Sequence, residues 1–530
     1  MSHRPWIAAA ALLCSLAASS PLRAEEDSEG VRYLIVCPAG LADAVEPLAD
    51  FRREQGFEVA RYLCPRLPAS ERREEIRREV TRRKPHFLLL VGDAEAIPPW
   101  IRDDVATDRP YGDADDDGFP EASVGRLPSG DPAVLAGMVG KIVAYESRRD
   151  GGTWRKQCAL VAGEARFSPL LDSLIEDLFR GIVTRAIDPA YDVDVTYANP
   201  RSPYCYPPER FADRVVERLN EGALVFAYVG HGAPDGVDHL IVRSPGGSAA
   251  VHDVLDVDSV PRLRSGVGSP LFIAIACSTG WYDGKRPCIG EELLAAAGGP
   301  VAFFGASRES NPVPNALLAS QIVAQIFRDT GPIRLGPALD RAERAMAQGP
   351  TQGTSDPIRA RVLGLAALLA PDEVKEGILP RHVDMYNLFG DPALSLARPD
   401  GEIEFAGPRT ASPGAELVVE GRVPTLPARE VRVTLEVARD RMAHAEPEGG
   451  ESPLERYRRA NDKVVLAATV VPDPQGAFRA VLVLPASLAR GSYLVKAFAA
   501  GADTCATGAF RCRVSSPKTE DAAAGDEDAH

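Results

Sequence analysis

The chain has 530 residues and a formal net charge of −15, with 45% hydrophobic and 25% charged residues. This length allows two to four domains with complete hydrophobic cores, and the composition is that of an ordinary globular protein. The acidic balance, with no basic patch or stripe, argues against a nucleic-acid-binding protein.

The N-terminus has the pattern of a secretory signal peptide. Arg4 supplies the positive charge, residues 6–18 are apolar, and Leu22-Arg23-Ala24 is a suitable cleavage site. The apolar stretch is short for a transmembrane helix, and no other segment is long and apolar enough to span a bilayer. We therefore expect residues 1–24 to be removed and the protein to be exported to the periplasm, the cell surface or the medium.

Residues 31–132 alternate between strand and helix patterns. Strands are predicted at 33–36, 58–63 and 87–91, and helices at 42–54 and 69–83. This alternation is typical of an α/β sub-domain with a parallel sheet.

An acidic turn lies within this sub-domain. Asp113, Asp115 and Asp117 alternate before Gly118, as in the opening of a calcium loop. The twelfth position of such a loop is Val124, which is apolar, so the segment is not an EF-hand. A structural Ca²⁺, with Asp116 and Glu121 as additional acidic ligands, and a solvated acidic turn are both open interpretations.

Residues 133–398 repeat the alternation on a larger scale, and we expect this segment to be the catalytic sub-domain. Strands are predicted at 158–162, 224–229, 271–276 and 301–304. Helices are predicted at 133–145, 168–183, 208–220, 290–297, 315–328, 336–347 and 358–369. The apolar strand segments indicate strands that are buried in a parallel sheet.

Two of these strands end in reactive side chains. His231 follows the strand at 224–229 between two glycines, and Cys277 follows the strand at 271–276. Ligands of open α/β sheets bind beyond the carboxyl ends of the strands, and an imidazole beside a thiol raises the thiolate fraction that a cysteine nucleophile needs. The alternatives are a structural histidine and a small buried cysteine.

The order of the two residues narrows the class of fold. His231 precedes Cys277 by 46 residues, which fits the caspase arrangement rather than that of papain-like enzymes, where the cysteine comes first. Cys288 is the reserve candidate nucleophile, but no strand end presents it. His239 and His252, with Asp235, Asp238 and Asp253, lack the compact spacing of a zinc site and are expected to flank the cleft as loop residues.

The composition changes after Arg398. Residues 399–514 contain short β-rich segments separated by turns, which predicts a β-sandwich. The acidic tail, residues 515–530, is expected to be disordered. Among the nine cysteines, Cys505 and Cys512 could bridge a hairpin, and Cys37 and Cys64 could pair if their strands are neighbours.

Several segments together resemble the gingipain-type cysteine peptidase family, whose fold is caspase-like. The His231 and Cys277 segments are the most specific. The segments that carry the resemblance are 87–93 with 97–98, 111–118, 124–128, 228–232, 275–280 and 387–393. The similarity covers about residues 31–398 and extends to 514 if the β-sandwich is the immunoglobulin-like domain that often follows in this family. No long pro-domain precedes Tyr33 and no recognisable sorting domain follows residue 514, so zymogen control and surface anchoring are not implied.

The resemblance implies roles for further residues. Glu164 occupies the place of the acidic residue that orients the catalytic histidine, where a carboxylate would fix the imidazole tautomer; the alternative is a surface glutamate. The backbone N–H groups of Gly232 and Cys277 would form the oxyanion hole. The strand at 301–304 leads into the wall of the S1 pocket, so Glu309 and Ser310 are candidate pocket residues, and Asp172 is the nearest match to an acidic specificity residue.

Glu309 would favour a basic P1 side chain. The adjacent Arg308 could neutralise it or point inward and favour an acidic P1 side chain, and both charges could also face solvent. We thus predict an exported, monomeric cysteine endopeptidase that acts on protein or peptide substrates and needs no cofactor for catalysis. The alternatives are an inactive caspase-like binding or scaffold protein of the envelope and a Cys-His transpeptidase.

Overall fold

The computed structural model describes residues 30–147, 150–164, 186–243, 247–264, 268–327, 332–348, 378–424, 428–442 and 450–515, with isolated positions between these ranges. The predicted signal peptide, the helices predicted at 168–183 and 358–369, Asp172 and nearly all of the acidic tail lie outside the described residues. Within the described residues, no helix has the length and hydropathy required to cross a membrane.

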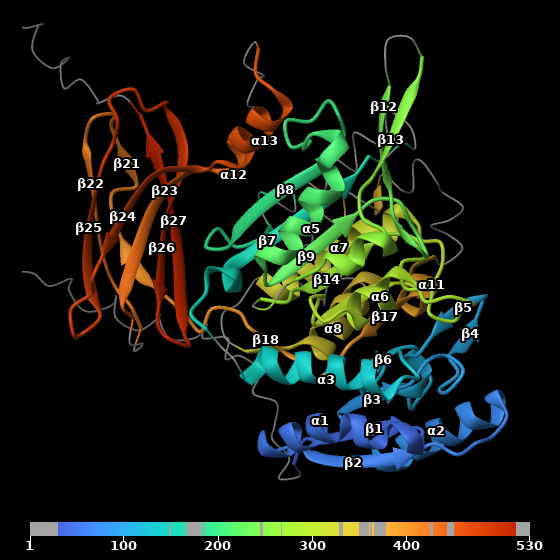
Figure 1. Cartoon of the computed structure of the whole chain (residues 1–530). Coiled ribbons are helices and arrows are strands. Elements are labelled where there is room, and N and C mark those ends of the chain that lie inside the picture. The colour runs from blue at the N-terminus through green and yellow to red at the C-terminus, as the bar shows by residue number, and fades with distance from the viewer. Residues whose placement is uncertain are drawn as a thin grey trace, which may run out of the picture.

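One ten-stranded sheet forms the centre of the α/β part (Figure 1). Its order is β2-β1-β3-β6-β17-β15-β14-β9-β7-β8. The bounds of its strands are β1 Arg32–Cys37, β2 Glu58–Leu63, β3 Phe87–Val91, β6 Ser123–Leu127, β7 Gln157–Gly163, β8 Asp192–Ala198, β9 Val225–Val229, β14 Leu271–Ile275, β15 Ala302–Ala306 and β17 Tyr386–Phe389.

The sheet consists of two parallel halves that meet in one antiparallel pair. β17 is parallel to β6 and antiparallel to β15, whereas β15, β14, β9, β7 and β8 are parallel to one another. The carboxyl ends of β15, β14, β9 and β7 therefore share an edge with the amino ends of β6 and β17. The α/β class predicted from the sequence is confirmed, but the sheet is mixed rather than parallel throughout, because β17 and β15 are antiparallel.

Aromatic rings hold the two halves together across the central strands. Phe226, Phe272, Phe303 and Phe389 come from β9, β14, β15 and β17 and stack in succession, with centroid separations of 4.9, 5.5 and 5.8 Å. All four side chains are almost completely buried. Such ring pairs add roughly 0.5–1.5 kcal/mol each beyond the burial of their surface.

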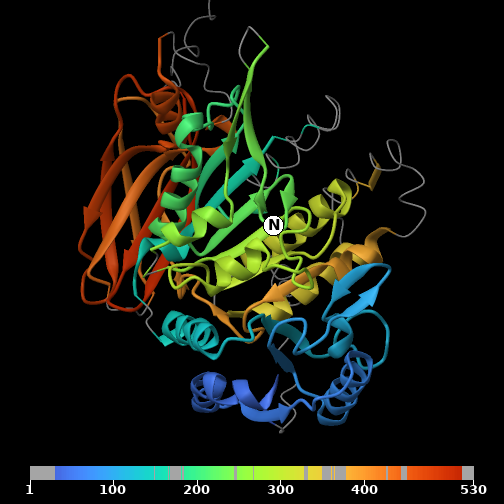
Figure 2. The ribbon, with the colours of Figure 1, turned by 45° about the vertical axis from the view of Figure 1, so that its right-hand side comes forward.

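Helices cover both faces of the sheet (Figures 1 and 2). On β1, Ile35 belongs to the cluster that includes α1, while its neighbours Leu34 and Val36 pack with α2, because side chains alternate across a strand. The helices are α1 Ala42–Glu54, α2 Ala69–Arg83, α3 Pro132–Ser147, α5 Phe211–Glu221, α6 Ile289–Ala295, α7 Pro312–Phe327, α8 Leu335–Gln348 and α11 Ile378–Met385.

The α/β part also contains short strand pairs outside the ten-stranded sheet. They are β4 Trp100–Arg102 with β5 Val105–Thr107, β10 Gly232–Ala233 with β11 Gly236–Val237, β12 His239–Arg243 with β13 Ala249–Asp253, and β16 Ile333–Arg334 with β18 Ser395–Leu396. The hairpin β12–β13 projects from the body of the molecule (Figure 1). His239 and His252 lie on this hairpin, so the expectation that they are loop residues is wrong.

The C-terminal part is all-β, as predicted. One of its sheets contains β19 Gly401–Glu402, β21 Thr410–Ala411, β23 Glu430–Val437, β24 Val464–Val470, β26 Gly491–Ala500 and β27 Cys505–Val514. The other contains β20 Glu404–Ala406, β22 Glu416–Arg422 and β25 Ala477–Val483. The two sheets enclose a separate core that includes Leu417, Val433 and Leu482. Its assignment to the immunoglobulin class stays a prediction.

The cysteine pairing across a C-terminal hairpin is wrong. Cys505 and Cys512 both lie on β27, seven positions apart, which in an extended strand is roughly 23 Å and far beyond the reach of a disulfide. Cys37 and Cys64 follow neighbouring strands, and the Cys64 N–H donates to the Cys37 carbonyl at 2.9 Å. Both thiols are free in this structure.

The C-terminal part contacts the outer edge of the ten-stranded sheet through polar groups. Asn461, at the end of α13 Pro453–Asn461, accepts a hydrogen bond from the Val195 N–H and donates one to the Val195 carbonyl, at 2.9 and 3.0 Å. Arg439, in α12 Arg439–Met442, donates to the carbonyls of Ile187 and Tyr191. These groups satisfy backbone atoms that an edge strand such as β8 would otherwise expose.

Candidate active site

The strand register brings His231 and Cys277 to the same place. Val229 of β9 pairs with Ile275 of β14, and the Gly230 N–H donates to the Ile275 carbonyl at 3.3 Å. His231 and Cys277 each stand two residues beyond this paired position, at the carboxyl edge of the sheet. Both side chains are partly exposed, as a nucleophile and its base must be to meet a substrate.

Gly232 permits the close approach of the two segments. A Cβ on Gly232 would lie 2.6 Å from the Cys277 carbonyl oxygen and 2.9 Å from the Cβ of Ala276. Neither is an allowed separation for a Cβ atom. Packing at this site therefore requires a glycine after the histidine. The same glycine is the one expected to supply an N–H group to the oxyanion hole.

Cys277 stands at a sharp turn that is fastened to the segment after β15. Ser278 has a positive φ of 56°, and its N–H donates to the Arg308 carbonyl at 2.9 Å. The Ser310 N–H donates to the Cys277 sulfur, with 3.3 Å between the two heavy atoms. The sulfur is thus exposed to substrate on one side and hydrogen-bonded on the other.

Cys288 lies in a different environment from Cys277. Its side chain is fully buried and forms the N-terminal cap of α6. Burial, followed by the negative charge of Glu291, raises the pKa of the Cys288 thiol well above its ordinary value. A thiol in such surroundings resists ionisation, so the structure disfavours the reserve nucleophile.

Glu164 follows β7, the neighbour of β9 in the sheet. Ala162 pairs with Val229, and a Cβ on Gly230 would lie 3.0 Å from the Gly163 Cα. The chain therefore passes directly beside the His231 segment just before it reaches Glu164, whose side chain is partly buried. The carboxylate also acts on the thiol of Cys205, where it adds to the effect of burial in raising the pKa to about 12.

The backbone of His231 is held by residues that the sequence analysis did not identify as functional. The Tyr228 hydroxyl donates to the His231 carbonyl at 2.8 Å, and the Asp238 N–H donates to the same carbonyl at 3.2 Å. The Asp238 carboxylate is paired with Arg166. The only sequence signal for this arrangement is a tyrosine within an otherwise apolar strand, which is weak.

Arg308 does not neutralise Glu309. Both Arg308 terminal nitrogens donate to the Asp283 carboxylate at 2.7 Å, and the guanidinium lies 4.8 Å from the centroid of the Trp281 ring. Glu309 is exposed. An inward-pointing Arg308 that would select an acidic P1 side chain is therefore inconsistent with the structure. Asp172 lies outside the described residues.

The acidic turn brings its carboxylates together. One ligand atom each from Asp113, Asp115 and Asp117 lies within 4.8 Å of the others. Asp113 is fully buried, and its Oδ1 atom has no hydrogen-bond partner within the described part of the chain. A cation would satisfy this atom. Asp116 lies outside this group of carboxylates and is paired with Arg77.

No comparable group supports a zinc site among the described His, Cys, Asp and Glu residues. His239 and Asp253 face each other across the β12–β13 hairpin, 3.2 Å apart, and both are more than half exposed. The interpretation of these residues as a metal site is therefore not supported.

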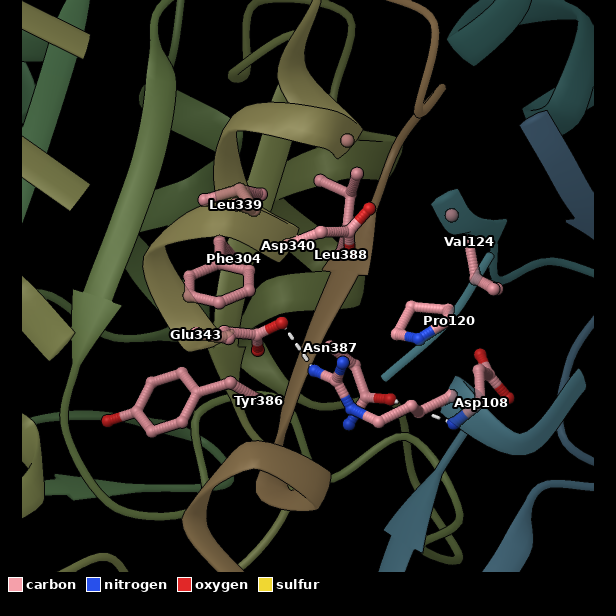
Figure 3. Close-up of a pocket in the computed structure, with 13 residues that line it drawn as sticks. Asp108, Pro120, Val124, Phe304, Leu339, Asp340, Glu343, Tyr386, Asn387 and Leu388 are labelled. Carbon is pink, nitrogen blue, oxygen red and sulfur yellow. Dashed lines mark hydrogen bonds and ion pairs between the residues drawn. The ribbon is translucent and has the colours of Figure 1, made fainter. Parts of the chain in front are cut away.

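A polar pocket lies at the junction of the two sheet halves (Figure 3). Arg109 forms an ion pair there with Glu343 of α8, and Asp340 and Asn387 also line the space. Burial raises the pKa of Glu343 to about 7 despite the opposing effect of Arg109.

Comparison with known proteins identifies the family. The sequence matches peptidase family C25 over residues 26–397, and the chain belongs to this family. Gingipain R2 from Porphyromonas gingivalis (strain ATCC BAA-308 / W83) is 22% identical over 282 residues, which cover 51% of this chain and 35% of the relative. Gingipain R1 from Porphyromonas gingivalis is 21% identical and is covered over 26% of its length. The matched region thus spans about a third or less of these curated relatives.

Solved structures share the fold. The crystal structure of the Arg-specific cysteine proteinase gingipain R has a TM-score of 0.53 and 17% identity, covering 93% of this chain and 99% of that one. A complex of the pro- and mature domains of a Porphyromonas gingivalis gingipain has a TM-score of 0.52 and 16% identity, with 91% and 100% coverage. The predicted membership of the gingipain-type family and the caspase-like fold are therefore confirmed.

Proposed function

We propose that the protein is a cysteine endopeptidase in which Cys277 attacks the scissile carbonyl and His231 moves the proton. The observation that carries this proposal is the convergence of both residues at the ends of paired strands, with Gly232 packed on the Cys277 backbone. Membership of peptidase family C25 supports the same reaction class.

The reaction would proceed through a thioester. The Cys277 thiolate adds to the peptide carbonyl, and the oxyanion accepts hydrogen bonds from the N–H groups of Gly232 and Cys277. Protonated His231 then gives its proton to the leaving amine as the carbon–nitrogen bond breaks. Water, deprotonated by His231, hydrolyses the thioester and regenerates the thiol.

Glu164 would act as a positioning residue for His231. Its place beyond Gly163, at the strand end beside the His231 segment, supports this role. A carboxylate near the imidazole stabilises the imidazolium that forms when His231 accepts a proton. Loss of such a group lowers the rate by less than loss of the nucleophile.

The substrates would be proteins or peptides met after export, and a basic P1 side chain fits best. Glu309 supports this preference because it is exposed next to Ser310, while Arg308 is occupied by Asp283. An exported, monomeric enzyme that needs no cofactor for catalysis remains our working proposal.

A structural Ca²⁺ would occupy the acidic turn, held by Asp113, Asp115 and Asp117. The buried, unpartnered Asp113 Oδ1 supports this assignment, because carboxylate oxygens are the ligands that Ca²⁺ prefers. The ion would be structural, since a rigid turn before β6 helps to fix the same sheet edge that carries Cys277.

The test of the endopeptidase proposal compares two cysteine variants. Cys277→Ala should abolish hydrolysis of a protein substrate and labelling by a peptidyl inactivator directed at cysteine, with unchanged circular dichroism. Cys288→Ala should retain both activities if it folds. Full hydrolysis by Cys277→Ala would overturn the proposal.

The same measurements separate the alternatives. An unmodified protein that folds but neither cleaves nor is labelled would be a binding or scaffold protein. Transfer of the acyl group to an added amine in preference to water would identify a transpeptidase with the same Cys-His pair.

A further inference from the structure

A chain of hydrogen bonds leads from the interior of the protein to the sulfur of Cys277. The Tyr386 hydroxyl donates to the Asn315 Oδ1 atom at 2.7 Å, and the Asn315 Nδ2 atom donates to the Ser310 hydroxyl oxygen at 2.8 Å. The Ser310 hydroxyl lies 3.6 Å from the Cys277 sulfur. Three elements contribute, since Tyr386 begins β17, Asn315 is in α7 and Ser310 is in the loop between β15 and α7.

The direction of donation follows from the chemistry of the amide. An asparagine side chain accepts only through its oxygen and donates only through its nitrogen. Because its oxygen is occupied by Tyr386, its nitrogen faces Ser310 and uses the hydroxyl oxygen as an acceptor. The Ser310 hydroxyl can then donate to the sulfur, where the Ser310 N–H already donates at 3.3 Å. The neutral thiol has the Ser310 carbonyl as its acceptor, at 3.6 Å.

Tyr386 is suited to be the first donor. Its side chain is 3% exposed, and its ring stacks on Phe304 with 5.3 Å between centroids. Burial, and then the negative charge of an ionised Cys277, raises the pKa of Tyr386 above its ordinary value, although Ser310 and the Ala276 backbone oppose this. The hydroxyl therefore stays protonated, and Figure 3 shows it directed away from the polar pocket beside it.

The loop that carries Ser310 is fixed by the same neighbouring segment. The Asn311 N–H donates to the Nε2 atom of His382 at 2.8 Å, and the Ser307 N–H donates to the Met385 carbonyl at 2.9 Å. Both partners belong to α11, which leads directly into β17. The position of Ser310 relative to the sulfur is therefore set by α11 and β17.

We propose that Tyr386 and Asn315 are positioning residues that stabilise the Cys277 thiolate through Ser310. This inference rests on the proposed function and deepens it. With the Ser310 hydroxyl donating to the sulfur, every link in the chain donates toward Cys277, an arrangement that favours the anion over the neutral thiol, and hydrogen bonds in such a chain polarise one another. Hydrogen bonds to charged groups are about twice as strong as neutral ones.

The test uses variants that remove one link without removing volume. Tyr386→Phe keeps the stacked ring and loses only the hydroxyl. It should lower kcat about tenfold with little change in KM, and should slow alkylation of Cys277 by iodoacetamide at pH 7 by a similar factor. The acid limb of the kcat/KM profile should also move to higher pH.

A second pair of variants tests the direction of the chain. Asn315→Asp can still accept from Tyr386 but cannot donate to Ser310, so the serine proton would turn toward the carboxylate. We expect its alkylation rate to fall at least as far as that of Asn315→Leu. A purely space-filling Asn315 would tolerate the isosteric aspartate better than leucine, and that order would overturn the proposal.

A distant tyrosine provides the control. Tyr493 is 2% exposed, and its hydroxyl donates to the Ala489 carbonyl at 2.5 Å in the C-terminal part. Tyr493→Phe should change stability by a similar amount and leave kcat and alkylation unchanged. If Tyr386→Phe keeps normal kcat and alkylation while Cys277→Ala is inactive, the positioning role is wrong and the endopeptidase stands. If Cys277→Ala is active, the proposed function itself fails.

Discussion

At the residue scale, the exposed side of the site is framed by Trp281, Arg308 and Glu309. Trp281 is 36% exposed, and the cation–π contact with Arg308 and the ion pair with Asp283 hold this rim in one arrangement. Glu309 is thus the charge on this rim that is available to a substrate side chain.

Glu309→Gln should lower kcat/KM about tenfold for a fluorogenic peptide with arginine or lysine at P1, because the substrate cation loses its partner. A matched peptide with an apolar P1 residue should be cleaved at an unchanged rate, which makes it the internal control. Equal or better cleavage of unmodified protein after aspartate, glutamate or an apolar residue would contradict the basic preference.

The sequence predicts Cys277 and His231 as site residues because both signals are local. Each residue ends an apolar strand next to glycine, and parallel strands deliver their carboxyl ends to one edge. Tyr386 and Asn315 could not be predicted in this way. Their hydrogen bond joins segments that are remote in the sequence, and a buried tyrosine or an asparagine early in a helix looks like an ordinary core or capping residue.

At the element scale, the orientation of β17 determines at which edge of the sheet the acidic turn lies. The prediction from alternating strands and helices was a parallel sheet, in which the turn before β6 and the end of β14 would lie at opposite edges. The strand Tyr386–Phe389 is only four residues long and contains a polar Asn387, so its pattern gave no sign of a reversal. The reversal brings the turn to the edge that carries the candidate active site.

Calcium in the millimolar range should raise the melting temperature of the protein, and a chelator should lower it, because a ligand that binds only the native state stabilises it. At one hundred times the dissociation constant the gain is about 2.7 kcal/mol. Asp113→Asn should abolish the response.

Asp116→Asn is the matched control for the calcium experiment. Asp116 belongs to the same turn but is paired with Arg77, so this variant should still respond to calcium. If the melting temperature of the unmodified protein is the same with calcium and with chelator, the acidic turn does not bind Ca²⁺.

At the scale of the whole molecule, the junction between the sheet halves contains more acid than base. Arg109 faces Glu343, with Asp340 and Asp384 nearby. Burial raises the pKa of all three carboxyl groups, that of Glu343 to about 7. The two halves are therefore joined through a region that holds protons which the unfolded chain would release.

This arrangement predicts the sign of a pH effect. Between pH 4.5, the ordinary value for glutamate, and about 7, the folded state keeps a proton on Glu343 that the unfolded state has lost. The contribution of Glu343 to the free energy of unfolding is therefore complete below pH 4.5 and is lost as the pH rises through about 7. The loss is roughly 3 kcal/mol at most. The melting temperature of Glu343→Gln should therefore depend less on pH between 5 and 8 than that of the unmodified protein.

The informative quantity is the slope of melting temperature against pH, rather than the melting temperature itself, because Glu343→Gln also removes the partner of Arg109. Glu420→Gln changes an acid whose side chain is 68% exposed and should leave the slope unchanged. Equal slopes for Glu343→Gln and the unmodified protein would show that Glu343 does not titrate in this window.

The place of β17 in the sheet has a consequence for how the protein is made. This strand is the last of the ten to leave the ribosome, yet it lies in the middle of the sheet, and it carries Tyr386, whose hydroxyl donates to Asn315. Chains are synthesised at about 5–20 residues per second, so several seconds separate the appearance of Cys277 from that of Tyr386. During this time the nascent chain holds both His231 and Cys277 but lacks the strand that joins the two halves of the sheet, so the candidate active site is completed only after translation has passed residue 389.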